Sequence, residues 1–159
     1  MTMAILPLEP LVVRCPDPDS TSRLGRALGS VAAAGDVVCL WGELGAGKTH
    51  LAKAFGAALG VTDTITSPSF ILMAEYRGRL PLFHLDPYRL ADAADALAGG
   101  LIDDRQADGV TLVEWPERLG DALPEGRLDV RIEGSGDEGR TITLVPGSPA
   151  YELYLEAAA

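Results

Sequence analysis

Residues 42–49 carry the pattern Gly-x-x-x-x-Gly-Lys-Thr, which fits the phosphate-loop motif at every specified position. Glycines let a backbone curl around a phosphate with its N–H groups pointing inward, and Lys48 would reach the β- and γ-phosphates. The Thr49 hydroxyl would bind Mg²⁺. The residues expected to hold a nucleotide here are Glu43, Leu44, Gly45, Ala46, Gly47, Lys48 and Thr49. The motif therefore predicts a site for ATP or GTP with Mg²⁺.

The flanking sequence provides the elements that this motif needs. Residues 37–41 are a short apolar run typical of a buried parallel strand. Residues 50–59 have helical spacing, and the positive end of such a helix attracts a phosphate. A plain glycine turn between a strand and a helix is the alternative, but it would not need Lys48 followed by Thr49.

Two carboxylates follow apolar strands further along the chain. Asp86 ends the apolar stretch 80–86, and Glu114 follows the apolar run 110–113. Ligands of open α/β sheets bind at the carboxyl ends of strands, where either side chain could hold Mg²⁺ or position an attacking water. The alternative is that each is an ordinary polar residue where a strand meets solvent. The candidate catalytic residues are Lys48, Asp86 and Glu114, and the candidate metal ligands are Thr49, Asp86 and Glu114.

Other residues near these strands leave their roles open. Trp115 is either a core aromatic or a lid over the nucleotide. His84 alternates with apolar neighbours, which favours a structural histidine over a functional one. Arg89 could approach a phosphate, but exposed arginines are common. The hydroxyl-rich loop 66–70 is either a bland polar loop or a switch-like segment, formed by Thr66, Ser67 and Ser69.

The remaining patterns predict a single α/β domain over residues 1–159, in which 151–159 is a loosely docked helix or a frayed tail. Pro16 and Pro18 end the first strand, and Asp19, Ser20 or Thr21 would cap the first helix. Further strands are expected at 11–15, 70–76, 80–86, 110–113, 128–133 and 140–145, with antiparallel hairpins at 70–86 and 128–145. Further helices are expected at about 21–34, 92–97, 116–119 and 149–158.

Composition excludes several classes of protein. The 159 residues are 47% hydrophobic and 23% charged, as in ordinary globular proteins. The chain has 13 basic and 23 acidic residues. The resulting net charge of −10 argues against extensive, non-specific binding of nucleic acid. Cys15 and Cys39 lack metal-ligand spacing. With no signal peptide and no membrane-length apolar stretch, we expect a soluble, cytoplasmic protein without membrane association.

Missing residue types narrow the choice of nucleotide. The chain has no asparagine, so the Asn-Lys-x-Asp guanine-reading signature of many GTPases is absent. Its one glutamine, Gln106, lies in a polar stretch, so the glutamine-rich signature of transporter ATPases is absent as well. These absences favour ATP over GTP.

Four motifs in order resemble one family. They are residues 42–49, Thr-Ser-Pro-Ser-Phe at 66–70, His-Leu-Asp-Pro-Tyr-Arg-Leu at 84–90 and Glu-Trp-Pro-Glu at 114–117. Together they resemble the TsaE family, small bacterial ATPases of the tRNA threonylcarbamoyladenosine pathway. The resemblance covers roughly residues 21–119. It implies a P-loop NTPase fold with a mixed sheet, and ATP hydrolysis that supports a TsaB–TsaD complex as it modifies adenosine 37 in tRNAs reading ANN codons.

The resemblance also implies roles for individual residues. Lys48 and Thr49 would bind phosphate and Mg²⁺, Asp86 and Glu114 would serve the metal or the attacking water, and Trp115 would lie beside the nucleotide. The tRNA would be contacted mainly through the partner proteins. Two departures from the family pattern stand out. Ser69 occupies a position where threonine is usual, and Ile102-Asp103-Asp104-Arg105 replaces a segment that usually contains an aromatic residue.

Two other functions use the same loop. A small-molecule kinase would need a basic acceptor pocket or lid, and the candidates are scattered arginines at 77, 79 and 89. A non-catalytic ATP sensor would bind the nucleotide without turnover. Release of phosphate to water separates a hydrolase from both.

Overall fold

A computed structural model describes residues 8–43, 46–65, 73–87 and 104–159. The helix expected at 92–97, Arg89 and the hydroxyl-rich loop 66–70 lie outside these ranges, as does the first part of the strand expected at 70–76.

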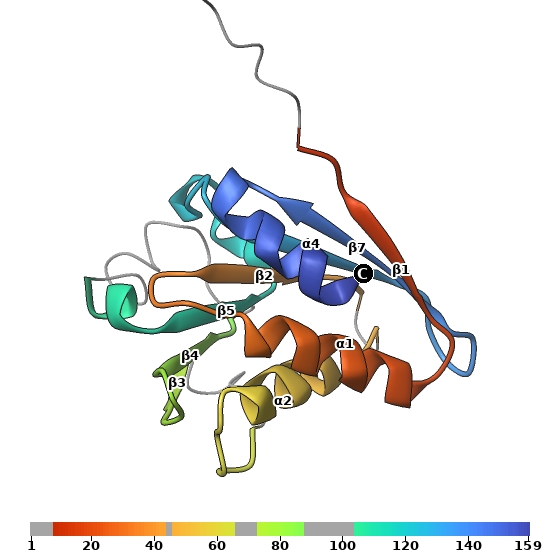
Figure 1. The fold of residues 1–159 in the computed structure, drawn as a ribbon, viewed down its shortest axis with the longest axis horizontal. Helices are drawn as coiled ribbons and strands as arrows, with labels where there is room; N and C mark the ends of the chain where they lie inside the picture. Colours follow the sequence, from red (N-terminus) through yellow and green to blue (C-terminus); the bar gives the residue numbers. More distant parts are fainter. Residues whose placement is uncertain (1–7, 44–45, 66–72, 88–103) are drawn as a thin grey trace, which may run out of the picture.

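Seven strands form one sheet in the order β1-β7-β6-β2-β5-β4-β3 (Figure 1). Strands β6, β2, β5 and β4 pair in parallel, and β7 and β3 run antiparallel to their neighbours. The predicted α/β fold with a mixed, mostly parallel sheet is confirmed. The strands are β1 (Leu11–Cys15), β2 (Val37–Trp41), β3 (Met73–Tyr76), β4 (Leu82–Leu85), β5 (Val110–Glu114), β6 (Leu128–Glu133) and β7 (Arg140–Pro146).

Strand β2, which leads into the glycine-rich loop, lies at the centre of the sheet between β6 and β5. Val38, Cys39 and Leu40 are all inaccessible to solvent, because apolar layers cover both faces. Val38 and Leu40 belong to the larger cluster on the helix side, and Cys39 belongs to a smaller cluster on the opposite face with Val113. Burial on both faces explains why this strand is an unbroken apolar run.

Helix α1 (Pro18–Ser30) starts and ends earlier than the sequence predicts. Asp17 is its N-cap: its carboxylate accepts from the Ser20 backbone N–H at 2.8 Å, and the Ser20 hydroxyl accepts from the Asp17 N–H at 3.2 Å. This reciprocal capping box satisfies two backbone donors, and Pro18 fits the first helical position because an N–H there has no helical partner. The helix expected over about 21–34 is therefore present, but its cap is Asp17 and not Asp19, Ser20 or Thr21, and it ends at Ser30.

Helix α2 (Lys48–Ala58) packs against α1 with very close backbone approach. A Cβ atom added at Gly25 would lie 2.8 Å from the Leu51 carbonyl oxygen, and one at Gly29 would lie 2.3 Å from the Phe55 carbonyl oxygen. Both separations are too short for a side chain, so two glycines one helical turn apart allow α1 to lie directly on the α2 backbone.

Arg79, in the turn between β3 and β4, holds the end of α1. Its Nη2 donates to the carbonyl oxygens of Gly29 at 3.0 Å, Ser30 at 3.3 Å and Ala32 at 2.9 Å. The last carbonyls of a helix lack helical partners, and a cation there also interacts favourably with the helix dipole.

Both predicted hairpins form within the described residues. Strands β3 and β4 pair with Ala74 opposite His84, and β6 and β7 pair with Val130 opposite Leu144. Pro81 stands just before β4, an interior strand, so it marks a strand start and not an edge. The short helix expected from Pro116 is a 3-10 turn over Pro116–Arg118. Further 3-10 turns are η1 (Asp104–Asp108), η3 (Gly120–Ala122) and η4 (Pro149–Tyr151).

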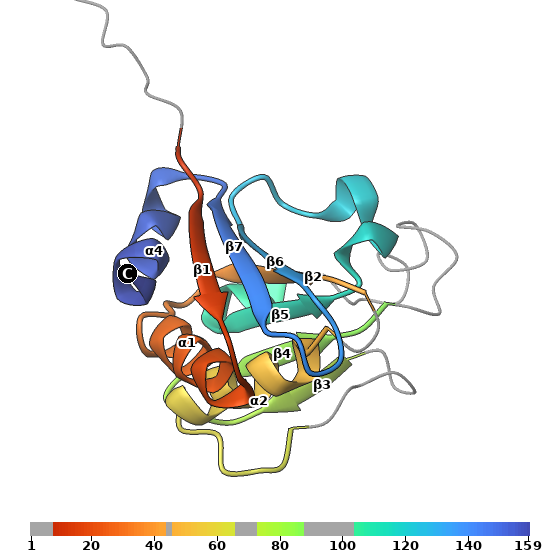
Figure 2. The same ribbon diagram turned by 90° about the vertical axis from the view of Figure 1, so that its right-hand side faces the viewer.

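The last helix, α4 (Glu152–Ala158), lies beside α1 on the same side of the sheet as α2, while the segment 116–123 covers part of the other side (Figure 2). Tyr154 is 1% exposed and its hydroxyl donates to Asp36. Of the two alternatives for the last residues, the structure shows a docked helix. Among the described helices, none has the length and apolar character needed to cross a membrane.

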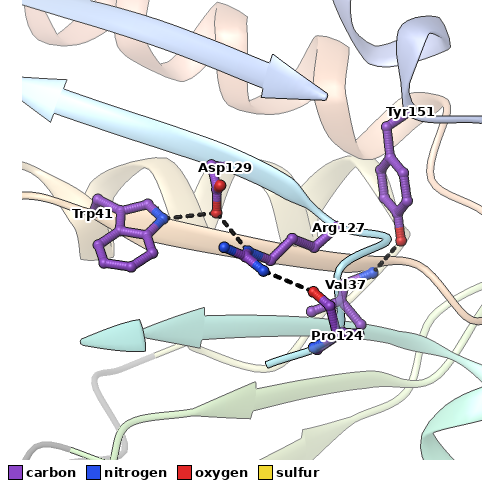
Figure 3. Close-up of polar contacts among 6 residues, drawn as sticks. All are labelled: Val37, Trp41, Pro124, Arg127, Asp129 and Tyr151. Atoms are coloured by element: carbon purple, nitrogen blue, oxygen red, sulfur yellow. Dashed lines mark hydrogen bonds and ion pairs between the residues drawn. The ribbon is translucent and has the colours of Figure 1, made fainter. Parts of the chain in front are cut away.

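Polar contacts brace β2 at both ends (Figure 3). At its start, the Val37 N–H donates to the Tyr151 hydroxyl at 3.0 Å. At its end, Trp41 Nε1 donates to Asp129 Oδ1 at 2.8 Å, and Arg127 Nε donates to the same oxygen at 2.9 Å. The strand that leads into the glycine-rich loop is thus fixed by residues more than eighty positions later in the chain.

Candidate nucleotide-binding site

Three parallel strands deliver the candidate residues to one edge of the sheet. Strands β2, β5 and β4 are neighbours in that order, so their carboxyl ends lie together. Beyond β2 comes Gly42, β5 ends at Glu114, and Asp86 follows β4 directly. In the register of these pairs Leu40 lies opposite Glu114 and Val113 opposite Leu85. Glu114 and Asp86 therefore come to corresponding positions at this edge.

Helix α2 begins at Lys48, immediately after the glycine-rich loop. Gly47 is its N-cap, with φ of 102° in the left-handed region, where a residue with a Cβ would be strained. The Ala46 N–H donates to the Glu43 carbonyl oxygen at 3.0 Å, which closes the turn. Lys48 and Thr49 thus occupy the first turn of an 11-residue helix, where free N–H groups and the helix dipole favour an anion. Leu44 and Gly45 lie outside the described residues.

Lys48 is folded back onto the loop and is only 6% exposed. Its Nζ donates to the Gly42 carbonyl oxygen at 2.8 Å and lies 3.5 Å from the centre of the Trp115 ring. Burial lowers the pKa of Lys48, because the ammonium loses part of its hydration. The carboxylates that oppose this shift are, in decreasing order of influence, those of Glu114, Glu117, Asp86 and Glu43. The ammonium is thus placed among negative charges at the mouth of the loop.

Trp115 adopts a backbone conformation that is unusual for its type. Its φ of 52° makes it the one non-glycine residue of the described ranges with a positive φ, a strain of about 1–3 kcal/mol. The turn carries the chain from β5 into Pro116 and places the indole over Lys48. Neither of the two apolar clusters of the described residues includes Trp115. Of the two alternatives raised by the sequence, the position beside the loop fits better than a core aromatic.

Asp86 and Glu114 are buried, with 2% and 3% of their surfaces exposed. Glu114 has a close partner that the sequence did not indicate: its Oε2 lies 2.7 Å from Nε2 of His84. Local alternation made His84 look structural, whereas the parallel pairing of β4 with β5 brings it to Glu114. The contact can be predicted only when the pairing of β4 with β5 is known, and no local sequence pattern indicates that pairing.

The donor set suits a magnesium ion bound together with phosphates. The hydroxyl of Thr49 and the carboxylates of Asp86 and Glu114 are oxygen ligands, which Mg²⁺ prefers. Within the described ranges, no three His, Cys, Asp or Glu side chains are grouped so as to hold a metal by themselves. Mg²⁺ usually takes one or two carboxylates and completes its shell with phosphate oxygens and water, so the residues present fit the ion.

A cavity of about 330 Å³ lies against the loop on the side of the β6–β7 hairpin. Its walls include Ala46 and Gly47 of the loop, His50 of α2, and the segments 15–18 and 136–140. Arg140 Nε donates to the Ala46 carbonyl oxygen at 2.9 Å and ties the hairpin to the loop. The cavity is therefore continuous with the residues expected to hold phosphate. Nothing in the sequence pointed to the hairpin as part of this site.

The expected switch-like residues Thr66, Ser67 and Ser69 lie outside the described residues.

The sequence and the structure were compared with known proteins, and the sequence matches point to one family. The family model described as "Threonylcarbamoyl adenosine biosynthesis protein TsaE" matches residues 15–142. A tRNA threonylcarbamoyladenosine biosynthesis protein TsaE from Bacillus subtilis is 38% identical over 150 residues, covering 94% of each chain. One from Treponema pallidum is 40% identical over 124 residues, covering 78% of this chain and 92% of its own. The crystal structure of Bacillus subtilis YdiB superposes with a TM-score of 0.77 at 35% identity, covering 95% of both chains.

Proposed function

The chain belongs to the TsaE family of tRNA threonylcarbamoyladenosine biosynthesis proteins, and from this premise we propose that it acts in that pathway as an ATPase. Its turnover would support or reset a TsaB–TsaD complex as that complex modifies adenosine 37 of tRNAs reading ANN codons. The proposal places the protein in the cytoplasm with the tRNA.

One observation carries the proposal. Lys48 opens α2 directly behind the glycine-rich loop that follows β2, and Glu114 and Asp86 lie at the carboxyl ends of the next two strands of the sheet, β5 and β4. A nucleotide whose phosphates lie at the start of α2 would therefore meet a cation and two carboxylates together. The absence of asparagine, and with it of the guanine-reading signature, favours ATP.

Each residue has a proposed part in hydrolysis. Thr49, with Asp86 or Glu114, would hold Mg²⁺, which when bound neutralises charge on the phosphates. Lys48 would leave the Gly42 carbonyl and stabilise the charge that develops on the β- and γ-phosphate oxygens. The carboxylate that is not bound to the metal would orient the attacking water and accept its proton. Trp115 would cover the phosphates from the side of β5.

The nucleoside would occupy the cavity beside Ala46 and Gly47. Its volume of about 330 Å³ suits a small ligand, and neither Asp86 nor Glu114 is among the residues that line it. The hairpin segment 136–140 would then contact the base or the ribose. Exchange of residues 136–139 for glycine and serine, with Arg140 and its bond to Ala46 kept, should weaken ATP binding and leave binding of inorganic triphosphate unchanged.

The partner complex is the second half of the proposal. A net charge of −10 disfavours direct binding of the negatively charged tRNA, so the tRNA would be bound mainly by TsaB–TsaD. The test compares ATP hydrolysis by the purified chain alone and with TsaB–TsaD, with Lys48→Ala as the inactive control. We expect weak turnover alone and faster turnover with the complex. Equal rates in both would end the coupling proposal.

A measurement of the products distinguishes this function from the alternatives. Hydrolysis releases inorganic phosphate without any added acceptor, whereas a small-molecule kinase transfers it to a metabolite. A sensor would bind ATP, shown by a higher melting temperature, without releasing phosphate even when TsaB–TsaD and tRNA are present.

A further inference from the structure

His84 and Glu114 form a buried pair between neighbouring strands. Nε2 of His84 lies 2.7 Å from Oε2 of Glu114, and the two residues are 1% and 3% exposed. In the parallel pairing of β4 with β5, His84 lies opposite Leu112, so Glu114 is the next residue along β5 that faces the same way. The contact is thus built into the register of the sheet.

Packing alone does not account for a histidine at this position. Its strand neighbour on the same face, Leu82, and the residue opposite, Leu112, both belong to the larger apolar cluster. Within the described ranges, Nδ1 of His84 is buried without a hydrogen-bond partner. A buried polar atom left unsatisfied costs about 1–3 kcal/mol, which an apolar side chain would avoid.

The pair has a different consequence for Glu114. A carboxylate this deeply buried needs a donor, and in the part of the chain that the structure describes, the one hydrogen bond to its side chain comes from His84. Oε2 is anchored by that bond, while Oε1 has no hydrogen bond to any of the described residues. Among the carboxylates that raise the pKa of Lys48 against the effect of burial, Glu114 has the largest effect.

We propose that His84 is a positioning residue, whose Nε2–H anchors Oε2 of Glu114 so that Oε1 is held toward the phosphate site. The inference rests on the proposed ATPase function and deepens it. A reacting group misplaced by about 1 Å can lose two orders of magnitude in rate, so fixing one oxygen of Glu114 matters for turnover. The loop and Lys48 carry most of the binding of ATP, so loss of the bond between His84 and Glu114 should lower kcat more than it changes KM.

The first test compares three substitutions of His84 in the presence of TsaB–TsaD. His84→Phe fills the space without a donor, His84→Gln places an amide N–H near the position of Nε2, and His84→Asn is too short to do so. We expect kcat to fall about 10–100-fold in the Phe and Asn variants, with KM for ATP nearly unchanged, and to recover in the Gln variant. Equal kcat in all three variants, or wild-type kcat in His84→Phe, would overturn the proposal.

A double substitution tests whether His84 acts through Glu114. Once Glu114→Gln has removed the carboxylate, adding His84→Phe should cost no further loss in kcat, because groups that act as a unit are not additive. If His84→Phe lowers kcat in the Glu114→Gln background as much as it does in the wild type, then His84 acts through a group other than Glu114. Two outcomes separate this inference from the function it rests on. Absence of phosphate release by the wild-type chain with TsaB–TsaD refutes the ATPase function, whereas turnover that is lost in Lys48→Ala but unchanged in His84→Phe refutes the role of His84 alone.

A spectroscopic measurement tests the pair without turnover. The chain has two histidines, His50 and His84, and His50 is exposed with contacts to Ser22 and Pro18. Nitrogen-15 spectra of the imidazoles should show both rings protonated at Nε2, because Nε2 of His50 also faces an acceptor, the Pro18 carbonyl oxygen. The signals of His84 are identified as those that disappear in His84→Gln. Glu114→Gln should shift these signals and leave the His50 signals in place. A His84 signal that ignores Glu114→Gln contradicts the anchoring bond.

Discussion

Gly29 of α1 lies so close to Phe55 of α2 that a Cβ atom on the glycine would be 2.3 Å from the Phe55 carbonyl oxygen. Since α2 begins with Lys48, this backbone contact fixes the helix that carries the candidate phosphate-binding residues. The position of Lys48 therefore depends on a residue of α1 that has no side chain.

Gly29→Ala should destabilise the protein by about 1–3 kcal/mol or more, because the added methyl group must push two packed helices apart. In urea unfolding this loss appears as a lower urea concentration at the midpoint, while the slope of unfolding free energy against urea concentration stays unchanged. Gly126→Ala is the matched control, since a Cβ there meets nothing within 4 Å. A wild-type midpoint for Gly29→Ala would show that the helices separate easily.

Lys48→Ala should abolish the stabilisation by MgATP and reduce hydrolysis by about 100-fold or more, because the cation that meets the phosphates is removed. Thermal unfolding with and without MgATP gives the first quantity and phosphate release gives the second. Lys53→Ala, on the exposed side of α2, should behave as wild type in both. Retained stabilisation by MgATP in Lys48→Ala would place the phosphates elsewhere.

Trp115 should report nucleotide binding by its fluorescence. Its ring lies 3.5 Å from Nζ of Lys48, and phosphates would draw the ammonium away. In Trp41→Phe, Trp115 is the single remaining indole, and its emission should change on addition of MgATP. In Trp115→Phe the emission comes from Trp41, whose indole N–H is hydrogen-bonded to Asp129. This emission should not change on addition of MgATP. The reverse pattern would contradict the placement of Trp115 at the site.

Arg79→Ala should lower the free energy of unfolding by about 1–2 kcal/mol, because three carbonyl oxygens at the end of α1 lose a charged donor. Arg77→Ala removes an exposed arginine from the same turn and should change stability by less than about 0.5 kcal/mol. Chemical denaturation of both variants makes the comparison. Equal effects would show that the helix end gains nothing from Arg79.

Alkaline pH should destabilise the protein through Cys39. Burial raises the pKa of this thiol from 9.0 to about 12. Below pH 9 both folded and unfolded chains keep the proton and no stability is lost. Between pH 9.0 and about 12 the unfolded chain releases the proton first, so stability falls, by at most about 1.4 kcal/mol per pH unit for this group.

Unfolding free energies between pH 8 and 11 measure this loss. Cys39→Ala should show a shallower decline than wild type, with the remaining slope due to Tyr151 and Tyr154, whose pKa values burial also raises. Identical slopes would mean that the folded protein exposes the thiol.

The sequence predicted those parts of the fold that local patterns encode. The apolar run at 37–41, the helix behind Lys48 and both hairpins follow from period and turn residues. The start of α1 differs from the prediction. Asp17 lies between Pro16 and Pro18, which indicate a strand end, so the predicted cap lay further along the chain, although Pro18 is in fact the first residue of the helix. The spacing of Asp17 and Ser20, three residues apart, is the signal in the sequence for this capping box.

The candidate site divides in the same way. Lys48, Thr49, Asp86 and Glu114 could be selected from motif and strand ends alone. The contact of His84 with Glu114 and the place of the hairpin segment 136–140 beside Ala46 could not, because both depend on which distant strands pair.

The strand pairing of β2 also has a consequence for synthesis of the chain on the ribosome. When α2 has emerged, the whole glycine-rich motif has been made, yet β5 and β6, the strands on both sides of β2, are still to come. Tyr151, which caps the first N–H of β2, follows later still. The nascent motif therefore lacks the scaffold that shapes it, and ligand binding at this loop is a property of the nearly finished chain.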